Sequence, residues 1–164
     1  MTMVCDILLD DSRWTERLDV DATVNVAVAK ALTVTKPKLH PEAEVSFTFS
    51  DDARIRALNA QWRGKDSPTN VLSFPATVGE ELTSTPLLGD VLLAFETVER
   101  EAAEERKLFA HHTTHLIVHG FLHLLGFDHE TDDDADVMEN YESRILTELG
   151  LPDPWATTSG GGRP

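Results

Sequence analysis

Cysteine is almost absent from this 164-residue chain, which contains only Cys5. An intramolecular disulfide is therefore excluded, and Cys5 stands in an apolar run that predicts a strand residue rather than a nucleophile. No apolar stretch is long enough to span a bilayer, and the first residues lack the basic segment that precedes the apolar region of a signal peptide. We therefore expect a cytoplasmic protein with no membrane partner.

Basic residues are also scarce, with 14 Lys and Arg against 29 Asp and Glu and a formal net charge of −15. Taken alone, this balance argues against a nucleic-acid partner, because phosphate binding draws on Lys and Arg. The charge is uneven, however: residues 130–153 hold nine acids and one base, whereas residues 53–65 hold four bases and no acid. That basic stretch either meets an anionic substrate beside a functional site or decorates a solvated helix face.

Length and hydrophobic patterning predict one domain over residues 1–155, followed by a polar, glycine-rich tail over residues 156–164 that we expect to be disordered. A helix capped by Ser50 is expected to present Ile55, Leu58 and Trp62 as its apolar face. The remaining patterns predict strands over residues 4–10, 44–50, 70–74 and 87–95, and helices over residues 21–35, 96–107, 109–125 and 132–149. This arrangement favours an α+β fold with one mixed sheet packed with helices.

Six of the seven histidines fall within residues 111–129. His119 and His123 are four residues apart, so on a helix they lie one turn apart on the same face. Gly126 can take the left-handed conformation that ends a helix, and the chain can then bring His129 back to the same point. Three neutral nitrogens with a fourth position left for water are typical of a catalytic zinc site. The sequence therefore predicts one zinc ion held by His119, His123 and His129.

The other histidines of this segment fit the predicted zinc site less well. His115 extends the same helix face, but His115, His119 and His123 together span about 12 Å, too far for bonds of about 2 Å to one ion. His115 is therefore a candidate for a contact behind the ligands or with substrate. His111 and His112 point to other faces, and packing explains them as well as function does.

The spacing of the three predicted ligands is also that of the metzincin proteases, which carry a glutamate directly after the first histidine as general base. Here that position is Gly120, which cannot move a proton. Asp128 could take that role or orient a ligand, and Glu130 is a weaker candidate. The site is therefore predicted to be hydrolytic but a poor match to peptide hydrolysis.

A second dense stretch, residues 58–75, is predicted to run from a helix through a tight turn into a strand. Most of its residues are explained as a well-made connection, since Gly64, Asp66 and Pro68 are ordinary turn residues. Arg63 is the exception, because a guanidinium can hold a phosphate through two parallel hydrogen bonds and stabilise the charge that grows on it.

The two stretches HGFLHLLGFDH (residues 119–129) and LNAQWRGKDSPTNVLSFP (residues 58–75) together resemble the YbeY family of bacterial metal-dependent endoribonucleases. The resemblance runs from about Val4 to Leu149 and includes the segment that begins at Leu88. It implies a zincin-like fold, a zinc ion on the three histidines, and Arg63 near the metal as a residue important for activity. It also implies single-stranded RNA as substrate, in 3′-end maturation of small-subunit ribosomal RNA and in ribosome quality control. Small-subunit proteins and assembly factors are the expected partners.

Two other functions stay open on the residues alone. One is a metalloprotease-like hydrolase whose general base has moved, and the other is a ribosome-assembly factor in which zinc is structural. Structural zinc usually has four protein ligands, often thiolates, and Cys5 is the only thiol. For the nuclease, either metal-bound water or the 2′-hydroxyl of the RNA could attack the phosphate.

Overall fold

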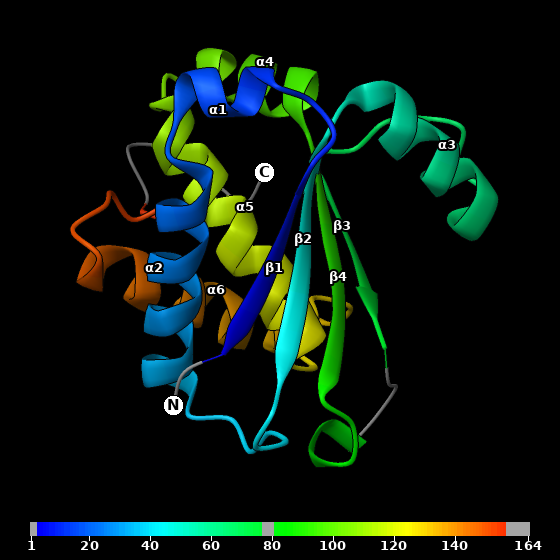
Figure 1. The fold of residues 1–164 in the computed structure, drawn as a ribbon. Helices are drawn as coiled ribbons and strands as arrows, with labels where there is room; N and C mark the ends of the chain where they lie inside the picture. Colours follow the sequence, from blue (N-terminus) through cyan, green and yellow to red (C-terminus); the bar gives the residue numbers. More distant parts are fainter. Residues whose placement is uncertain (1–2, 77–80, 157–164) are drawn as a thin grey trace.

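A four-stranded mixed sheet forms the centre of the computed structural model, which describes residues 3–76 and 81–156 (Figure 1). Strands β1 and β2 are parallel, as are β2 and β4, whereas β3 runs antiparallel to β4 at the edge. Their spatial order is β1 (Val4–Leu9), β2 (Glu44–Ser50), β4 (Leu87–Ala94) and β3 (Val71–Pro75). The predicted α+β fold with one mixed sheet is confirmed.

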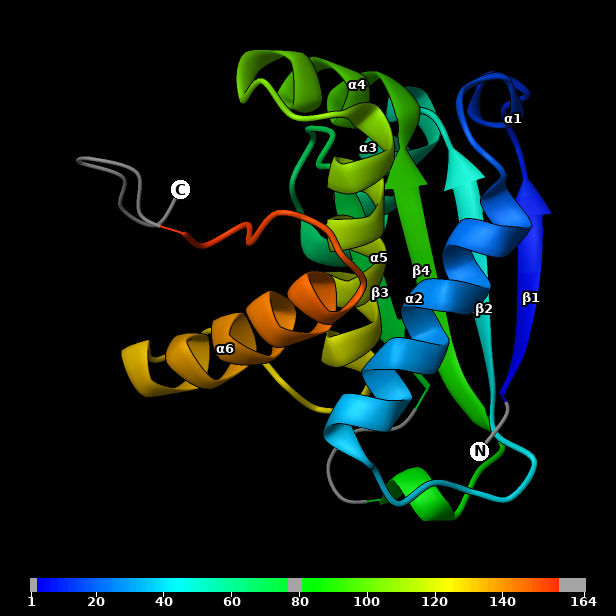
Figure 2. The same ribbon diagram turned by 90° about the vertical axis from the view of Figure 1, so that its left-hand side faces the viewer.

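Helices α2 and α5 lie against one face of this sheet, and α6 packs on both of them from outside (Figure 2). Helix α3 packs on the opposite face, where Ile55 contacts a small cluster from β3 and β4. No helix in the described part of the chain is both long and apolar enough to cross a bilayer. The α-helices are α1 (Arg13–Arg17), α2 (Val20–Thr35), α3 (Asp52–Arg63), α4 (Phe95–Glu104), α5 (Phe109–Leu124) and α6 (Asp132–Glu148).

Helix α5 is buried on nearly all sides, between the sheet, α2 and α6. It contacts β3 and β4 directly, and it shares one core cluster with Val45, Phe47 and Phe49 of β2, each with no exposed surface. Burying each apolar side chain of this size stabilises the fold by about 1.5–3 kcal/mol. The helix that carries the histidines is therefore fixed in place along its length by its buried apolar side chains, which are Leu116, Ile117, Val118, Phe121, Leu122 and Leu124.

Two differences from the predicted helix boundaries have a clear structural cause. Helix α4 ends at Glu104 rather than at residue 107, because Arg106 takes a left-handed conformation with φ of 56°. The cap of α3 is Asp51 rather than Ser50, since the Asp51 side chain accepts a hydrogen bond from the Arg54 amide. The short helix α1 carries too few apolar residues for its period to be detected.

The predicted apolar face of α3 is wrong at Trp62. Its side chain is 65% exposed, while Ile55 is fully buried. The helix packs on the sheet through Ile55 and Leu58, and its last turn extends into solvent (Figure 1). The predicted tail over residues 156–164 lies outside the described residues from position 157 onward.

Cys5 lies in β1 and packs partly against the core. Burial, together with the nearby Asp6 charge, raises the pKa of its thiol to about 11. The thiol rather than the nucleophilic thiolate is thus the form present at neutral pH. The interpretation of Cys5 as a strand residue is confirmed.

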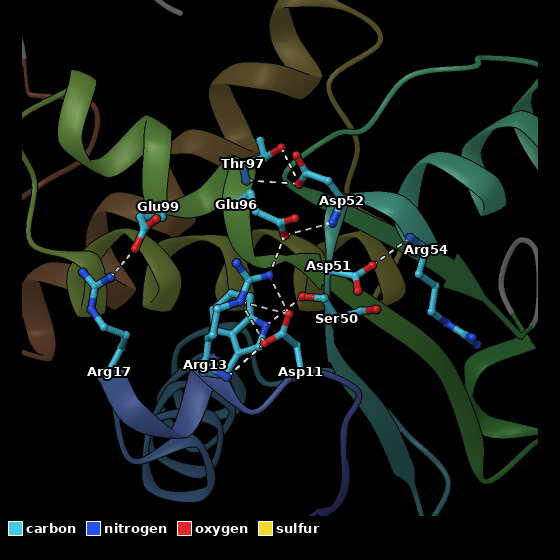
Figure 3. Close-up of polar contacts among 11 residues, drawn as sticks. Asp11, Arg13, Arg17, Ser50, Asp51, Asp52, Arg54, Glu96, Thr97 and Glu99 are labelled. Atoms are coloured by element: carbon cyan, nitrogen blue, oxygen red, sulfur yellow. Dashed lines mark hydrogen bonds and ion pairs between the residues drawn. The ribbon is translucent and has the colours of Figure 1, made fainter.

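Polar side chains meet where the parallel strands end, a place where open α/β sheets commonly bind ligands. The Asp52 carboxylate accepts hydrogen bonds from the amide and hydroxyl of Thr97, at 3.1 and 2.8 Å (Figure 3). Arg13 bridges Asp11 at 2.6 Å and Glu96 at 3.2 Å. These groups bind one another and join α1, α3 and α4, so this end of the sheet is a structural junction.

Candidate metal centre

His119 and His123 project from the same face of α5, as their spacing of four residues requires. Their Nε2 atoms lie 3.1 Å apart, and their ring centroids 4.6 Å apart. Two nitrogen ligands of a tetrahedral zinc ion are separated by about 3.3 Å, because each bond is about 2.0–2.1 Å long. The pair is therefore spaced as two ligands of one ion.

The chain reverses directly after α5 at Gly126. The Gly126 amide donates to the His123 carbonyl and the Phe127 amide to the Leu122 carbonyl, both at 3.1 Å, which is the Schellman pattern of helix ends. Gly126 has a φ of 103°, in the region that side chains other than glycine rarely adopt. The predicted role of this glycine in ending the helix is confirmed.

This turn brings His129 to the other two histidines. Its ring lies 5.7 Å from that of His119 and 5.2 Å from that of His123, measured between centroids. One potential ligand atom from each of the three residues lies within 4.8 Å of the others. The three predicted ligands are thus brought to one place, where they could hold a metal ion.

The second ring nitrogens of two of these histidines are already engaged. His119 Nδ1 lies 2.9 Å from a carboxylate oxygen of Glu142, and His123 is hydrogen-bonded to the backbone of Phe127. A neutral imidazole has one donor and one acceptor nitrogen, so the nitrogen that donates leaves a lone pair on the other. Both Nε2 atoms then offer lone pairs to the same point, which is a donor set that fits a metal ion such as zinc.

Burial and charge set the protonation of this centre. Burial, with the neighbouring His119 and His129, lowers the pKa of His123 to about 4, so this imidazole is neutral at pH 7 as a metal ligand must be. Burial works to raise the pKa of the Glu142 carboxyl, but hydrogen bonds from His115 and His119 outweigh it and hold that pKa at about 2. A neutral His123 therefore lies in the same centre as the ionised Glu142 carboxylate.

The remaining histidines of α5 stay outside the trio. The His115 ring lies 6.4 Å from that of His119 and turns its Nε2 to Glu142, behind the ligands. His112 is buried and bound at 2.9 Å to Glu101, which holds α5 to α4. His111 lines a separate cavity of about 360 Å³. None of the three lies among the ligand atoms gathered around His119.

A cleft of about 740 Å³ opens on the three histidines and also contains Arg63 and Asp128. Arg63 comes from the end of α3, where its guanidinium donates to the Ser73 carbonyl at 3.3 Å. Asp128 is half-buried and accepts a hydrogen bond from the Glu130 amide at 3.2 Å. Arg63 and the segment 119–129, far apart in the sequence, therefore share one cleft, while their roles in it stay predictions.

Gly120 occupies the position of the metzincin glutamate, and the structure leaves no room for a side chain there. A Cβ atom on Gly120 would lie 2.6 Å from Cγ1 of Val91 and 3.1 Å from Oγ of Ser73. The Ser73 hydroxyl also donates to the Gly120 carbonyl at 3.1 Å, which holds α5 against β3. A glutamate of the metzincin kind is therefore excluded at this position.

We expect Gly120→Ala to lower the free energy of unfolding by about 1–3 kcal/mol, the usual cost of forcing a methyl group into a packed core. The stiff, fully buried Val91 cannot move away. Denaturant unfolding of the two single variants and of Gly120→Ala with Val91→Ala measures this contact. We expect the double variant to be more stable than the sum of the single losses predicts, by about 1 kcal/mol, whereas simple additivity would contradict a direct clash.

Sequence reasoning missed Glu142 and Trp155. Glu142 has 1% of its surface exposed and contacts both His115 and His119, and Trp155 donates its indole N–H to the same carboxylate at 3.0 Å. One signal was present in the sequence. Glu142 lies on the buried stripe of α6, at helical spacing from Ala135, Met138, Ile145 and Leu146, where a carboxylate needs a partner.

Together these features define a class: a single α+β domain whose histidine centre, at the end of a buried helix, opens on a cleft beside the antiparallel edge strand. A sequence model of the family described as Endoribonuclease YbeY matches residues 10–150. The chain belongs to this family.

Two relatives carry the same name as the family, and one solved structure has a similar fold. Endoribonuclease YbeY of Azorhizobium caulinodans is 50% identical over 160 residues, covering 97% of this chain and all of the relative. The protein of the same name from Nitrobacter winogradskyi is 49% identical over 159 residues, covering 94% and 83%. The solution structure of TM1509 from Thermotoga maritima has a TM-score of 0.58 and 24% identity over 98% of this chain and all of that one, and this likeness supports the fold alone.

Proposed function

We propose that this protein is a zinc-dependent endoribonuclease that cuts single-stranded RNA in the cytoplasm. Its proposed role is 3′-end maturation of small-subunit ribosomal RNA and ribosome quality control. The observation that carries the proposal is the convergence of three imidazoles beside a cleft that also holds Arg63. Relatives named as endoribonucleases over nearly the whole chain support the choice of RNA over other substrates.

His119, His123 and His129 would hold the ion. When bound, zinc lowers the pKa of a water molecule or neutralises charge on a phosphoryl oxygen. Arg63 is the only Arg or Lys in the cleft lining that the structure describes. We assign it to binding the phosphate and stabilising the charge that grows on it during cleavage.

We assign proton transfer to Asp128. It lies in the cleft between the turn and His129, and Gly120 has no room for the alternative glutamate. Its carboxylate has one oxygen bound to the Glu130 amide, which fixes its orientation. Asp128 would accept a proton from the attacking water.

Product ends test this assignment. We expect linear phosphate ends, and continued cleavage when a 2′-deoxynucleotide replaces the nucleotide at the cut, since water needs no neighbouring hydroxyl. Mass spectrometry of the fragments distinguishes the outcomes. Ends with a 2′,3′-cyclic phosphate, together with resistance of the deoxy substrate, would assign the attack to the 2′-hydroxyl of the RNA.

The strongly negative charge of the chain favours a role for partner proteins in RNA binding. With a net charge of −15, the chain has little long-range attraction for RNA. We propose that small-subunit proteins or assembly factors present the RNA to the cleft. Incubating zinc-loaded protein with single-stranded RNA, duplex RNA and casein tests the substrate class: we expect cleavage of the single-stranded RNA only, and cleavage of casein would favour the peptidase instead.

A further inference from the structure

Glu142 is a buried carboxylate that lies against three ring nitrogens, from His115, His119 and Trp155. Its Oε2 faces His119 Nδ1 at 2.9 Å, while its Oε1 accepts from the Trp155 indole at 3.0 Å and faces His115 Nε2. Burying a charged carboxylate costs free energy unless hydrogen bonds compensate the charge. Here the three partners are ring nitrogens of aromatic side chains. This cluster joins α5, α6 and the segment that ends in Trp155.

The Glu142 carboxylate determines which ring nitrogen of His119 carries the proton. An ionised carboxylate only accepts hydrogen bonds, so Nδ1 of His119 must be the donor. The Nε2 atom is then left with its lone pair, directed at Nε2 of His123 and toward the cleft. The opposite tautomer would place a proton on Nε2, where a metal ion cannot bind.

We infer that Glu142 is a positioning residue that fixes the tautomer and the ring orientation of His119, so that this histidine can hold the metal ion. The inference rests on the ligand role proposed for His119. Partners of this kind commonly tune metal affinity by 10–100-fold.

His115 and Trp155 hold Glu142 itself in place. Both bind Oε1, and their rings meet edge to face with centroids 5.9 Å apart. With two donors on one oxygen, the carboxylate group cannot rotate without losing them. This gives His115 a function, a contact behind the ligands, that its position on the helix predicted but did not specify.

The isosteric substitution Glu142→Gln is the sharpest test. Glutamine has one acceptor oxygen and one NH₂ group, so it cannot accept from both sides. Because two donors face the position of Oε1, the oxygen is expected to turn to them and the NH₂ group to face His119. Nδ1 of His119 would then have to accept, and the proton would move to Nε2.

We expect Glu142→Gln to bind zinc 10–100-fold more weakly than the wild type, measured by competition with a chromophoric chelator. The control is Glu148→Gln, on the same helix, whose exposed carboxylate pairs with Arg144 at 2.8 Å away from the histidines. We expect the control to bind zinc as the wild type does. If the wild type binds zinc and Glu142→Gln binds it equally well, the inference is overturned while the proposed function stands.

A second measurement does not depend on any variant folding. In the zinc-free wild type, ¹⁵N correlation spectra of the histidine rings should show His119 with its proton on Nδ1. A proton found mainly on Nε2 would overturn the inference. Trp155→Phe keeps an aromatic side chain but removes the indole N–H donor, and we expect it to weaken zinc binding less than Glu142→Gln does. A loss as large as that of Glu142→Gln would contradict the central place given to the carboxylate.

Discussion

His123→Ala is expected to remove zinc binding at the concentrations where the wild type is saturated. Losing one of three ligands must cost more than losing an outer partner, so we expect affinity to fall by more than about 100-fold. The His119 and His129 rings would remain, 5.7 Å apart between centroids, as an incomplete donor set. Cleavage of RNA should be lost with the metal, and isothermal titration with zinc measures the first effect directly.

The matched control is His111→Ala, on the same helix. His111 lines a different cavity and lies outside the histidine trio, so we expect zinc affinity and cleavage to stay at the wild-type level. Circular dichroism should show both variants folded. Retention of tight, stoichiometric zinc binding by His123→Ala would show that the metal is held elsewhere.

Arg63→Ala is expected to leave zinc binding and folding intact while lowering kcat for RNA cleavage by about 10²–10³, the usual cost of removing one group that stabilises charge in the transition state. Stability should change little, because Arg63 is exposed, and its contacts within the described residues are a 3.3 Å hydrogen bond to the Ser73 carbonyl and a distant contact with the Phe74 ring. Steady-state cleavage of a short single-stranded RNA is the measurement.

Two further variants make this result specific. Arg63→Lys keeps the charge but loses the planar pair of donors, so we expect it to recover only part of the rate. Arg56→Ala lies on the same helix, where Arg56 is paired with Asp66 at 2.8 Å, and should cleave normally. Full activity of Arg63→Ala would remove Arg63 from the mechanism.

The histidine centre was predictable because its geometry is local. His119, His123, Gly126 and His129 lie within 11 residues, and the pitch of a helix with its glycine end places them almost without help from the rest of the fold. The mixed sheet was predictable for a similar reason, since each strand carries its own apolar pattern. Strand order and the parallel pairs are long-range properties, which those patterns do not contain.

Glu142 and Trp155 show where such reasoning stops. Glu142 is one of nine acids in residues 130–153. Its place on the apolar stripe of α6 predicts burial, but only the packing of α6 on α5 shows which groups it binds. Trp155 reaches the centre because the chain folds back after α6. The prediction that Trp62 is buried was wrong for the opposite reason. Its spacing matches a buried stripe, but the sheet does not extend far enough to cover it.

The central claim is that three imidazoles hold one ion and leave one side open to the cleft. X-ray absorption spectroscopy at the zinc edge, on protein loaded with one equivalent of zinc, tests it most directly. We expect three imidazole nitrogens at about 2.0–2.1 Å, one oxygen from water and no sulfur. A closed shell of four protein ligands, or a protein that takes up no zinc, would contradict the account.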